Sequence, residues 1–393
     1  MISFTRLAAG IAMAGALAVS ITAVAQASPH TTPVGKKLAV LKGSGENSYF
    51  GSAVAISGQI AVVGDGEDSS ATDAPLGHIY IFTKSAAGWK QVARLTGSNG
   101  FATNEFAQTA IAISGTTVVV GAPGGGSTGL PGAVYVFSRI GGVWKQAAEL
   151  KGPAGSTTFG SAVSISGSTI VATGDISATD DGAAWVFTKT AGGWKQAAEL
   201  GPSDAGFGRS VAVSGTTMVV GDTTAAVGAG RAFVFTKTAP GWKQAAEIKG
   251  SDTRSDGFET TSDHFGWSVT ITGATIVVGA PLHADYRGAV YEFGHRAAKW
   301  KQTAELKGAV AGIGTTGSGL GASGKTLITN IVTHAYLFTG SSGHWKRTEL
   351  KTSYFDMQEV VGLSGSVALV AVPAHPTGTK GKTAPAEVDV FEA

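Results

Sequence analysis

Short apolar segments recur along the whole chain, separated by glycine, serine, threonine and aspartate. Each unit contains four of them, as in Val54–Ser57, Ile60–Val63, Ile79–Phe82 and the segment that follows Gly88. The second is apolar throughout, which is typical of a strand covered on both faces. The fourth alternates between apolar and polar positions, as a strand with one solvated face does. The pattern predicts an all-β protein built from four-stranded units.

A phrase close to Trp-Lys-Gln-Ala-Ala-Glu-Leu marks the fourth segment of each unit. Its tryptophans are Trp89, Trp144, Trp194, Trp242, Trp300 and Trp345. Spacings of 45 to 58 residues suit a four-stranded propeller blade whose length varies in its loops. We expect these tryptophans to pack between neighbouring blades rather than to stack on sugars.

The first and second segments of each unit meet at a serine–glycine or threonine–glycine pair. The pairs are Ser57–Gly58, Ser114–Gly115, Ser166–Gly167, Ser214–Gly215, Thr272–Gly273, Ser323–Gly324 and Ser364–Gly365. Glycine supplies the positive φ that tight hairpins need. Seven pairs therefore predict seven blades.

Only six tryptophan segments accompany these seven pairs. The last unit stops after its third segment, Glu387–Phe391, while residues 35–43 match the fourth segment without its tryptophan. We therefore predict that residues 36–42 form the outer strand of the last blade. Such a shared blade leaves no open sheet edge, so the pattern favours a closed ring over an open solenoid.

These residues resemble the FG-GAP repeat of integrin α-chain propellers and of exported bacterial proteins. The Phe-Gly element stands at Phe50–Gly51, Phe159–Gly160, Phe207–Gly208 and Phe265–Gly266, and degrades to Phe106–Ala107, Thr316–Gly317 and Met357–Gln358. The Gly-Ala-Pro element is intact at Gly121–Pro123 and Gly279–Pro281. The resemblance covers about residues 36–393 and implies a seven-bladed β-propeller. It says little about function, because this scaffold serves many roles.

The calcium-binding members of the family carry aspartate-rich loops between the first two strands. Here that place holds only the serine–glycine or threonine–glycine turns, which offer no carboxylate. The resemblance therefore implies no calcium site at any position of this chain.

The first 27 residues have the pattern of a secretory signal. Arg6 precedes an apolar stretch from Leu7 to about Val24, and Ala25–Ala27 is a small-x-small cleavage site. We expect cleavage after Ala27, a short linker over residues 28–35 and a propeller over 36–393. The protein is expected to be secreted and extracellular, without stable membrane insertion; the alternative interpretation of the apolar stretch is a membrane anchor.

Composition restricts the function further. The chain has no cysteine, and its 29 basic residues nearly balance its 27 acidic ones. Near neutrality gives no indication of nucleic-acid binding. The scattered histidines and serines form no recognisable catalytic motif, so we predict no catalytic residue, no cofactor and no metal, and an enzyme is not expected. Two acidic groups could hold a cation, although solvated loop carboxylates are commoner. The first is Asp65, Glu67, Asp68 and Asp73, and the second is Asp252, Asp256, Glu259 and Asp263.

The loops between the second and third strands, and between the fourth strand and the next unit, vary in length and composition. Both sets should emerge on one face, where recognition normally resides. The candidate ligand-binding residues lie there in the fifth unit: Arg254, Asp256, Phe258, His264, His283, Asp285, Tyr286 and Arg287.

The sequence leaves three functions open. The first is a monomeric, non-catalytic recognition or adhesion protein that binds an extracellular protein or surface. The second is a carbohydrate-binding propeller, which repeated pockets with an aromatic residue and an acid would support. The third is an exported enzyme with a site in the central channel, whose residues would converge only in space.

Overall fold

Each repeated unit folds into one four-stranded antiparallel sheet, or blade. Blades 1 to 3 consist of β2 (Phe50–Ser57), β3 (Ile60–Asp65), β4 (His78–Ser85) and β5 (Gly88–Leu95); β6 (Ile111–Ser114), β7 (Thr117–Ala122), β8 (Ala133–Ile140) and β9 (Val143–Lys151); and β10 (Ala162–Ser166), β11 (Thr169–Ile176), β12 (Asp181–Thr190) and β13 (Gly193–Leu200). Blades 4 to 6 consist of β14 (Phe207–Ser214), β15 (Thr217–Asp222), β16 (Arg231–Thr238) and β17 (Gly241–Ile248); β18 (Ser268–Thr272), β19 (Thr275–Ala280), β20 (Ala289–Arg296) and β21 (Lys299–Lys307); and β22 (Leu320–Ser323), β23 (Thr326–Ile331), β24 (His334–Ser341) and β25 (His344–Leu350). Blade 7 combines β26 (Val361–Ser364), β27 (Val367–Val372), β30 (Glu387–Glu392) and β1 (Lys37–Leu41). A separate two-stranded ribbon pairs β28 (His375–Pro376) with β29 (Thr383–Ala384).

The computed structural model describes residues 33–43, 49–66, 77–98, 106–108, 110–124, 131–154, 156, 158–176, 181–201, 206–255, 257, 262–307, 319–331, 334–341, 344–352, 360–376 and 383–393. The expected signal segment, and the degraded elements Thr316–Gly317 and Met357–Gln358, lie outside these residues. Among the helices of the described residues, none is long and apolar enough to span a membrane.

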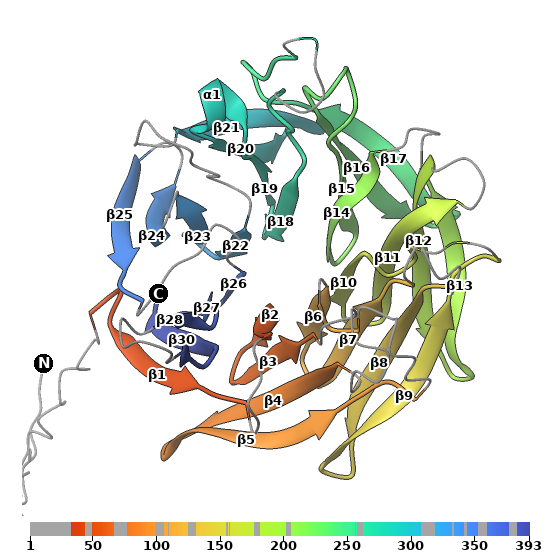
Figure 1. Cartoon of the computed structure of the whole chain (residues 1–393). Helices are drawn as coiled ribbons and strands as arrows, with labels where there is room; N and C mark the ends of the chain where they lie inside the picture. Colours follow the sequence, from red (N-terminus) through yellow and green to blue (C-terminus); the bar gives the residue numbers. More distant parts are fainter. Residues whose placement is uncertain are drawn as a thin grey trace, which may run out of the picture. The chain divides into compact units, whose positions relative to one another are not determined.

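The seven blades form a ring around their innermost strands (Figure 1). The innermost strands are β2, β6, β10, β14, β18, β22 and β26, and each contacts the next in this order. Strand β26 in turn contacts β2, so the ring is closed. The prediction of a closed seven-bladed β-propeller is confirmed.

Closure uses both ends of the propeller, as the repeat count predicts. Strand β1 pairs antiparallel with β30, and Figure 1 shows it on the outside of the last blade. The ammonium group of Lys37 lies 2.5 Å from the carboxylate of Asp389, which is fully buried. Burial raises the pKa of Asp389, and the ion pair with Lys37 opposes this only in part.

The serine–glycine pairs form tight turns, and they also join the blades. All seven glycines have φ between 55° and 58°. In five places the glycine N–H donates to the serine Oγ of a neighbouring blade: Gly115 to Ser57, Gly167 to Ser114, Gly215 to Ser166, Gly365 to Ser323 and Gly58 to Ser364. The last of these bonds links the first blade to the seventh. We call this set the turn seam.

Close packing explains why the Phe-Gly and Gly-Ala-Pro elements occur together. Gly160 has φ of 98°, a conformation that side-chain-bearing residues rarely adopt. A Cβ on Gly121 in blade 2 would lie 2.0 Å from the carbonyl oxygen of Gly160 in blade 3. Gly221 and Gly266 meet in the same way between blades 4 and 5. The two glycines therefore allow the backbones of adjacent blades to touch.

Aromatic side chains fill the space beside these contacts. Phe159 is fully buried and meets Trp185 edge-on, with ring centroids 5.4 Å apart. The six repeated tryptophans, Trp89, Trp144, Trp194, Trp242, Trp300 and Trp345, each pack into an apolar cluster shared by two adjacent blades. The prediction that they serve blade-to-blade packing is confirmed.

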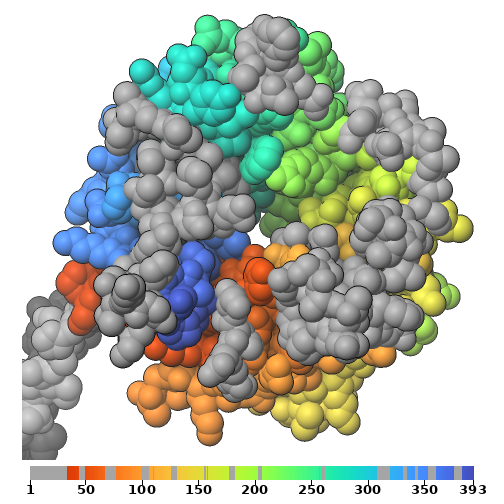
Figure 2. All heavy atoms as spheres, in the orientation of Figure 1, coloured from red at the N-terminus to blue at the C-terminus, as the bar shows by residue number. Residues whose placement is uncertain are grey.

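Antiparallel pairing gives the ring two different faces. The face with the strand 1–2 and strand 3–4 hairpins, here the turn face, carries the turn seam. The opposite face, here the loop face, carries the connections between strands 2 and 3 and between successive blades. Blade 5 forms the teal part of the surface in Figure 2.

Candidate functional site

Three connections meet at the loop face of blade 5. They are the turn after β17 (250–255), the segment that precedes β18 (262–267) and the connection from β19 to β20 (281–288). The third contains the short turn α1 (His283–Tyr286), which Figure 1 shows beside the blade. These connections carry six of the eight predicted ligand-binding residues; Asp256 and Phe258 lie outside the described residues.

His283 joins two of these connections. Its side chain is only 5% exposed, and its Nδ1 lies 2.9 Å from Oδ2 of Asp263. The hydrogen bond with Asp263 raises the pKa of His283, and this effect outweighs the opposing effect of burial. The Asp263 carboxylate also accepts a 2.6 Å hydrogen bond from the backbone N–H of Arg254. The buried pair therefore fixes all three connections relative to one another.

The other ring nitrogen of His283 faces two more carboxylates. Its Nε2 lies 3.6 Å from Oδ2 of Asp252 and 3.9 Å from Oε1 of Glu305. The ammonium group of Lys307 lies 3.2 Å from each of the same two oxygens. We call these five residues, Asp252, Asp263, His283, Glu305 and Lys307, the blade-5 cluster.

Asp252, in the connection from blade 4 to blade 5, is held in place by a strand of blade 5. Its Oδ1 accepts a 2.8 Å hydrogen bond from the hydroxyl group of Tyr291 on β20. Burial alone would raise the pKa of the Asp252 carboxyl group. The hydrogen bonds from Tyr291 and Lys307, with nearby positive charge, lower it by more, so the pKa lies below its ordinary value. Asp252 is therefore ionised near neutral pH, with Oδ2 directed at His283 and Lys307.

The turn above this cluster has an unusual backbone. Ala284, Asp285 and Tyr286 all have positive φ, with values of 53°, 59° and 63°. A left-handed conformation costs a residue other than glycine roughly 1–2 kcal/mol. Asp285, Tyr286 and Arg287 are nevertheless exposed at the tip, Tyr286 by 39%. Strained backbone of this kind concentrates at functional sites.

His264 and Arg254 take different roles from the exposed tip. His264 is buried, and its ring meets Trp267 edge-on at 5.9 Å, so it supports the loop rather than facing solvent. Arg254 is exposed, and its backbone carbonyl accepts a hydrogen bond from Asp263 N–H. The structure thus brings His283, Asp285, Tyr286, Arg287 and Arg254 to the loop face of blade 5, where His283 is buried and the other four are exposed.

Sequence reasoning missed Glu305 and Lys307. Both stand in the repeated outer-strand phrase, where every unit has similar residues and none attracts notice. A contact that occurs in two blades shows why Glu305 and Lys307 reach the loop. The side-chain oxygen of Gln302 on β21 accepts a hydrogen bond of 2.9 Å from the backbone N–H of Ser251. Gln146 on β9 accepts the same bond from Ser98. In blades 2 and 5 the outer strand therefore holds the connection that arrives from the preceding blade.

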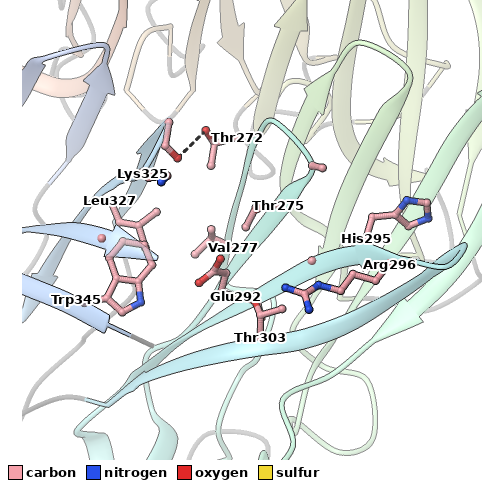
Figure 3. A pocket seen from close by; sticks show the side chains of 14 residues that line it. Thr272, Thr275, Val277, Glu292, His295, Arg296, Thr303, Lys325, Leu327 and Trp345 are labelled. Atoms are coloured by element: carbon pink, nitrogen blue, oxygen red, sulfur yellow. Dashed lines mark hydrogen bonds between the residues drawn. The ribbon is translucent and has the colours of Figure 1, made fainter. Parts of the chain in front are cut away.

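A second candidate lies on the turn face, between blades 5 and 6 (Figure 3). This pocket has a volume of about 300 Å³ and is lined by Glu292, Arg296, Lys325 and Trp345, among others. It lies where the repeat is broken. Glu292, only 8% exposed, replaces the valine, isoleucine or leucine of blades 1 to 4 and 6, and Gly294 replaces their serine or threonine. The missing side chain opens the space beside the acid.

A third hollow, of about 430 Å³, lies between blades 3 and 4 at the loop face. Its lining includes Arg209, whose guanidinium group stacks 3.9 Å above the ring of Trp267, and Asp175, which accepts hydrogen bonds from Ser156 and Thr158. Both charged groups are therefore already engaged, Arg209 with Trp267 and Asp175 with Ser156 and Thr158. Among the residues with defined positions, only Asp252, His283 and Glu305 form a cluster with metal-ligand spacing.

The fold defines the chain as a seven-bladed β-propeller with four-stranded antiparallel blades. The FG-GAP repeat family matches residues 89–137, 194–235 and 242–293. These matches and the contacts of the Phe-Gly and Gly-Ala-Pro glycines agree, and the chain is an FG-GAP repeat β-propeller.

Two similar solved structures, both of Sqt1, support the fold alone. Sqt1 from Chaetomium thermophilum has a TM-score of 0.54 at 16% identity over 91% of this chain and 98% of its own, and a second structure of it has a TM-score of 0.53 at 15% identity over the same shares. A functionally unknown protein from Desulfotomaculum acetoxidans DSM 771 has a TM-score of 0.49 at 12% identity over 77% of this chain and 85% of its own. No curated protein matches the sequence.

Proposed function

We propose that this protein is an exported, monomeric, non-catalytic recognition propeller that binds an extracellular protein or surface ligand. The contact surface consists of Asp285, Tyr286 and Arg287 on the exposed turn over the blade-5 cluster, together with Arg254 on the connection after β17. Its chemistry suits a polar partner, since it offers both charges and one aromatic ring on a rigid blade.

The backbone of α1 carries this proposal. Three consecutive residues other than glycine hold positive φ while two of them are exposed. Below them, the buried hydrogen bond between His283 and Asp263 fixes the base of the turn. A surface that is held in a costly conformation is already arranged for binding, which reduces the entropy lost on association.

Export rests on the N-terminal pattern of Arg6, the apolar stretch and Ala25–Ala27. The test is N-terminal sequencing of the protein secreted by a bacterial host. The expected result is a mature chain that begins at Ser28. Retention of the full-length chain in the membrane fraction would refute the proposal of export.

The binding test uses two matched double variants. Tyr286→Ala with Arg287→Ala removes an exposed ring and a cation from the loop face. Arg139→Ala with Ile140→Ala removes an exposed cation and an exposed apolar side chain from the turn face of blade 2. The labelled mature protein is applied to intact cells and extracellular material. Only the blade-5 variant should lose binding, with both melting temperatures unchanged.

One observation favours carbohydrate binding as a second function. The pocket between blades 5 and 6 combines an aromatic side chain, Trp345, with the buried acid Glu292. Such a pair suits a sugar ring, which stacks on the indole and donates hydroxyl hydrogens to the carboxylate. The test is a glycan array probed with the wild-type protein and with Gly294→Thr, which restores the side chain typical of the repeat and fills the pocket. Signals that this variant abolishes would support a lectin.

A further inference from the structure

We propose that Asp252, His283 and Glu305 form a zinc-binding site on the loop face of blade 5. The site is independent of the recognition function proposed above, because it lies beneath the exposed turn and consists of different side chains. The connection after β17, the turn α1 and the outer strand β21 each supply one ligand. The ligand atoms lie within 4.8 Å of one another.

The donor set fits a transition metal. Zinc binds both imidazole nitrogen and carboxylate oxygen, and zinc sites with three protein ligands leave a fourth position open for water. Tetrahedral coordination with bonds of about 2.0–2.1 Å places ligand atoms about 3.3 Å apart. The Nε2 atom of His283 lies 3.6 Å and 3.9 Å from the two oxygens, so small side-chain movements complete the geometry.

A second observation separates this site from an ordinary group of surface acids. The Nδ1 atom of His283 contacts the buried carboxylate of Asp263, and the side chains are 5% and 7% exposed. A neutral imidazole that donates from Nδ1 directs the lone pair of Nε2 at Asp252 and Glu305. Metal-binding histidines almost always have such an outer partner. Tyr291 orients Asp252 in the same way, through its other oxygen.

Lys307 would compete with a metal ion for the carboxylate oxygens of Asp252 and Glu305. Its ammonium group lies 3.2 Å from Asp252 Oδ2 and from Glu305 Oε1, the two oxygens that would bind the metal. Its side chain is 64% exposed, so it can withdraw into solvent without disturbing the core. A divalent ion would replace its single charge between two carboxylates. Removing this lysine should therefore tighten metal binding.

Calcium fits these residues less well. It prefers six to eight oxygen ligands, whereas a buried imidazole nitrogen stands at the centre of this cluster. Zinc accepts nitrogen readily and needs only four ligands. We therefore expect zinc to bind in the presence of excess calcium.

The experiment titrates the mature protein with zinc chloride in a buffer that does not chelate metals, at pH 7.5, by calorimetry. The wild type should bind one equivalent. His283→Ala should weaken binding more than about 100-fold, and Asp263→Asn, which removes the outer partner, about 10–100-fold. Lys307→Met should strengthen binding, an effect that a misfolded protein cannot produce. The control is His334→Ala, because His334 lies 3.8 Å from Glu349 on an exposed part of blade 6.

Circular dichroism and thermal melts establish that each variant is folded. If His283→Ala does not fold, the other two variants still test the proposal, because Asp263→Asn should weaken zinc binding and Lys307→Met should strengthen it. The proposal is overturned if the wild type binds no zinc, if His334→Ala weakens binding as much as Asp263→Asn does, or if Lys307→Met leaves the affinity unchanged.

Discussion

The two faces of the propeller differ in whether their contacts are repeated from blade to blade. On the turn face, one hydrogen bond between a glycine N–H and a serine Oγ recurs in five places around the ring. On the loop face, the blade-5 cluster and the left-handed turn above it depend on residues that stand outside the repeat, such as His283 and Asp263. Repeated residues build the ring, whereas the candidate site combines residues of the repeat, such as Glu305, with residues that depart from it.

Blade 5 departs from the repeat on both faces. Its turn carries threonine instead of serine, and Thr272 Oγ1 donates to the carbonyl of Gly324 at 3.4 Å instead of accepting from its N–H. The pocket with Glu292 opens beside this turn, and Figure 3 shows the altered bond at its edge. Variants of repeated and of unique residues should therefore have separable effects on stability and binding.

The largest effect on stability is expected from removing β1. A chain that begins at Gly43 lacks the strand that pairs with β30 and the buried Leu41, and it exposes a sheet edge. We expect a loss on the order of 5 kcal/mol in the free energy of unfolding. Denaturant melts of this chain and of one that begins at Pro33 measure the loss. Equal stability of the two chains would contradict closure by β1.

A repeated aromatic residue should matter more to stability than a unique one. Phe159→Ala removes a fully buried ring between Trp185 and Phe187 and should cost about 3–5 kcal/mol. Tyr286→Ala removes an exposed ring and should change stability by less than about 0.5 kcal/mol. The same melts compare both variants. A large destabilisation by Tyr286→Ala would show that the turn also supports the ring.

The closing blade should make stability depend on pH in the acid range. Burial raises the pKa of Asp389 above its ordinary value of 3.8. The Asp389 carboxylate therefore binds a proton more tightly in the native state than in the unfolded state. Its stabilising contribution is therefore fully present below pH 3.8 and is lost as the pH rises through the folded-state value. Melts of the wild type and of Asp389→Asn between pH 3 and about pH 7 test this. The difference between them should grow with pH, and a constant difference would contradict the prediction.

A smaller loss than that of a buried aromatic ring is expected in the turn seam. Ser114→Ala removes the acceptor for Gly167 N–H and should cost about 0.5–1.5 kcal/mol. Ser214→Ala is the matched control, because no seam bond joins Ser214 to Gly273 among the described residues. Equal losses from the two variants would mean that the serine acts within its own turn.

The sequence predicted the fold well because the fold is repeated. Seven serine–glycine and threonine–glycine pairs predicted seven blades, and the six tryptophans with the matching residues 35–43 predicted the shared blade. The seam bonds were not predicted, because one turn gives no information about the position of the next. The fold and the packing of the repeated tryptophans thus follow from local patterns that recur, while the individual hydrogen bonds between blades do not.

The candidate site was predicted only in part, for two physical reasons. His283, Asp263 and Asp252 attracted notice as unusual loop residues, but Glu305 stands in a repeated phrase and joins them only through the arrangement of the blades. The left-handed backbone at Ala284 and Asp285 has no local signal either, since neither residue is glycine. Tertiary contacts impose that conformation.

Photo-crosslinking tests the central claim, recognition through blade 5, most directly. Tyr286→p-benzoylphenylalanine places a reactive group on the loop face, and Ile140→p-benzoylphenylalanine places one at an exposed site, 55% accessible, on the turn face. Each protein is irradiated with intact cells and extracellular material, with and without excess unlabelled wild type. The account predicts a crosslink from position 286 that the competitor abolishes, and none from position 140. A competed crosslink from position 140 alone would contradict it.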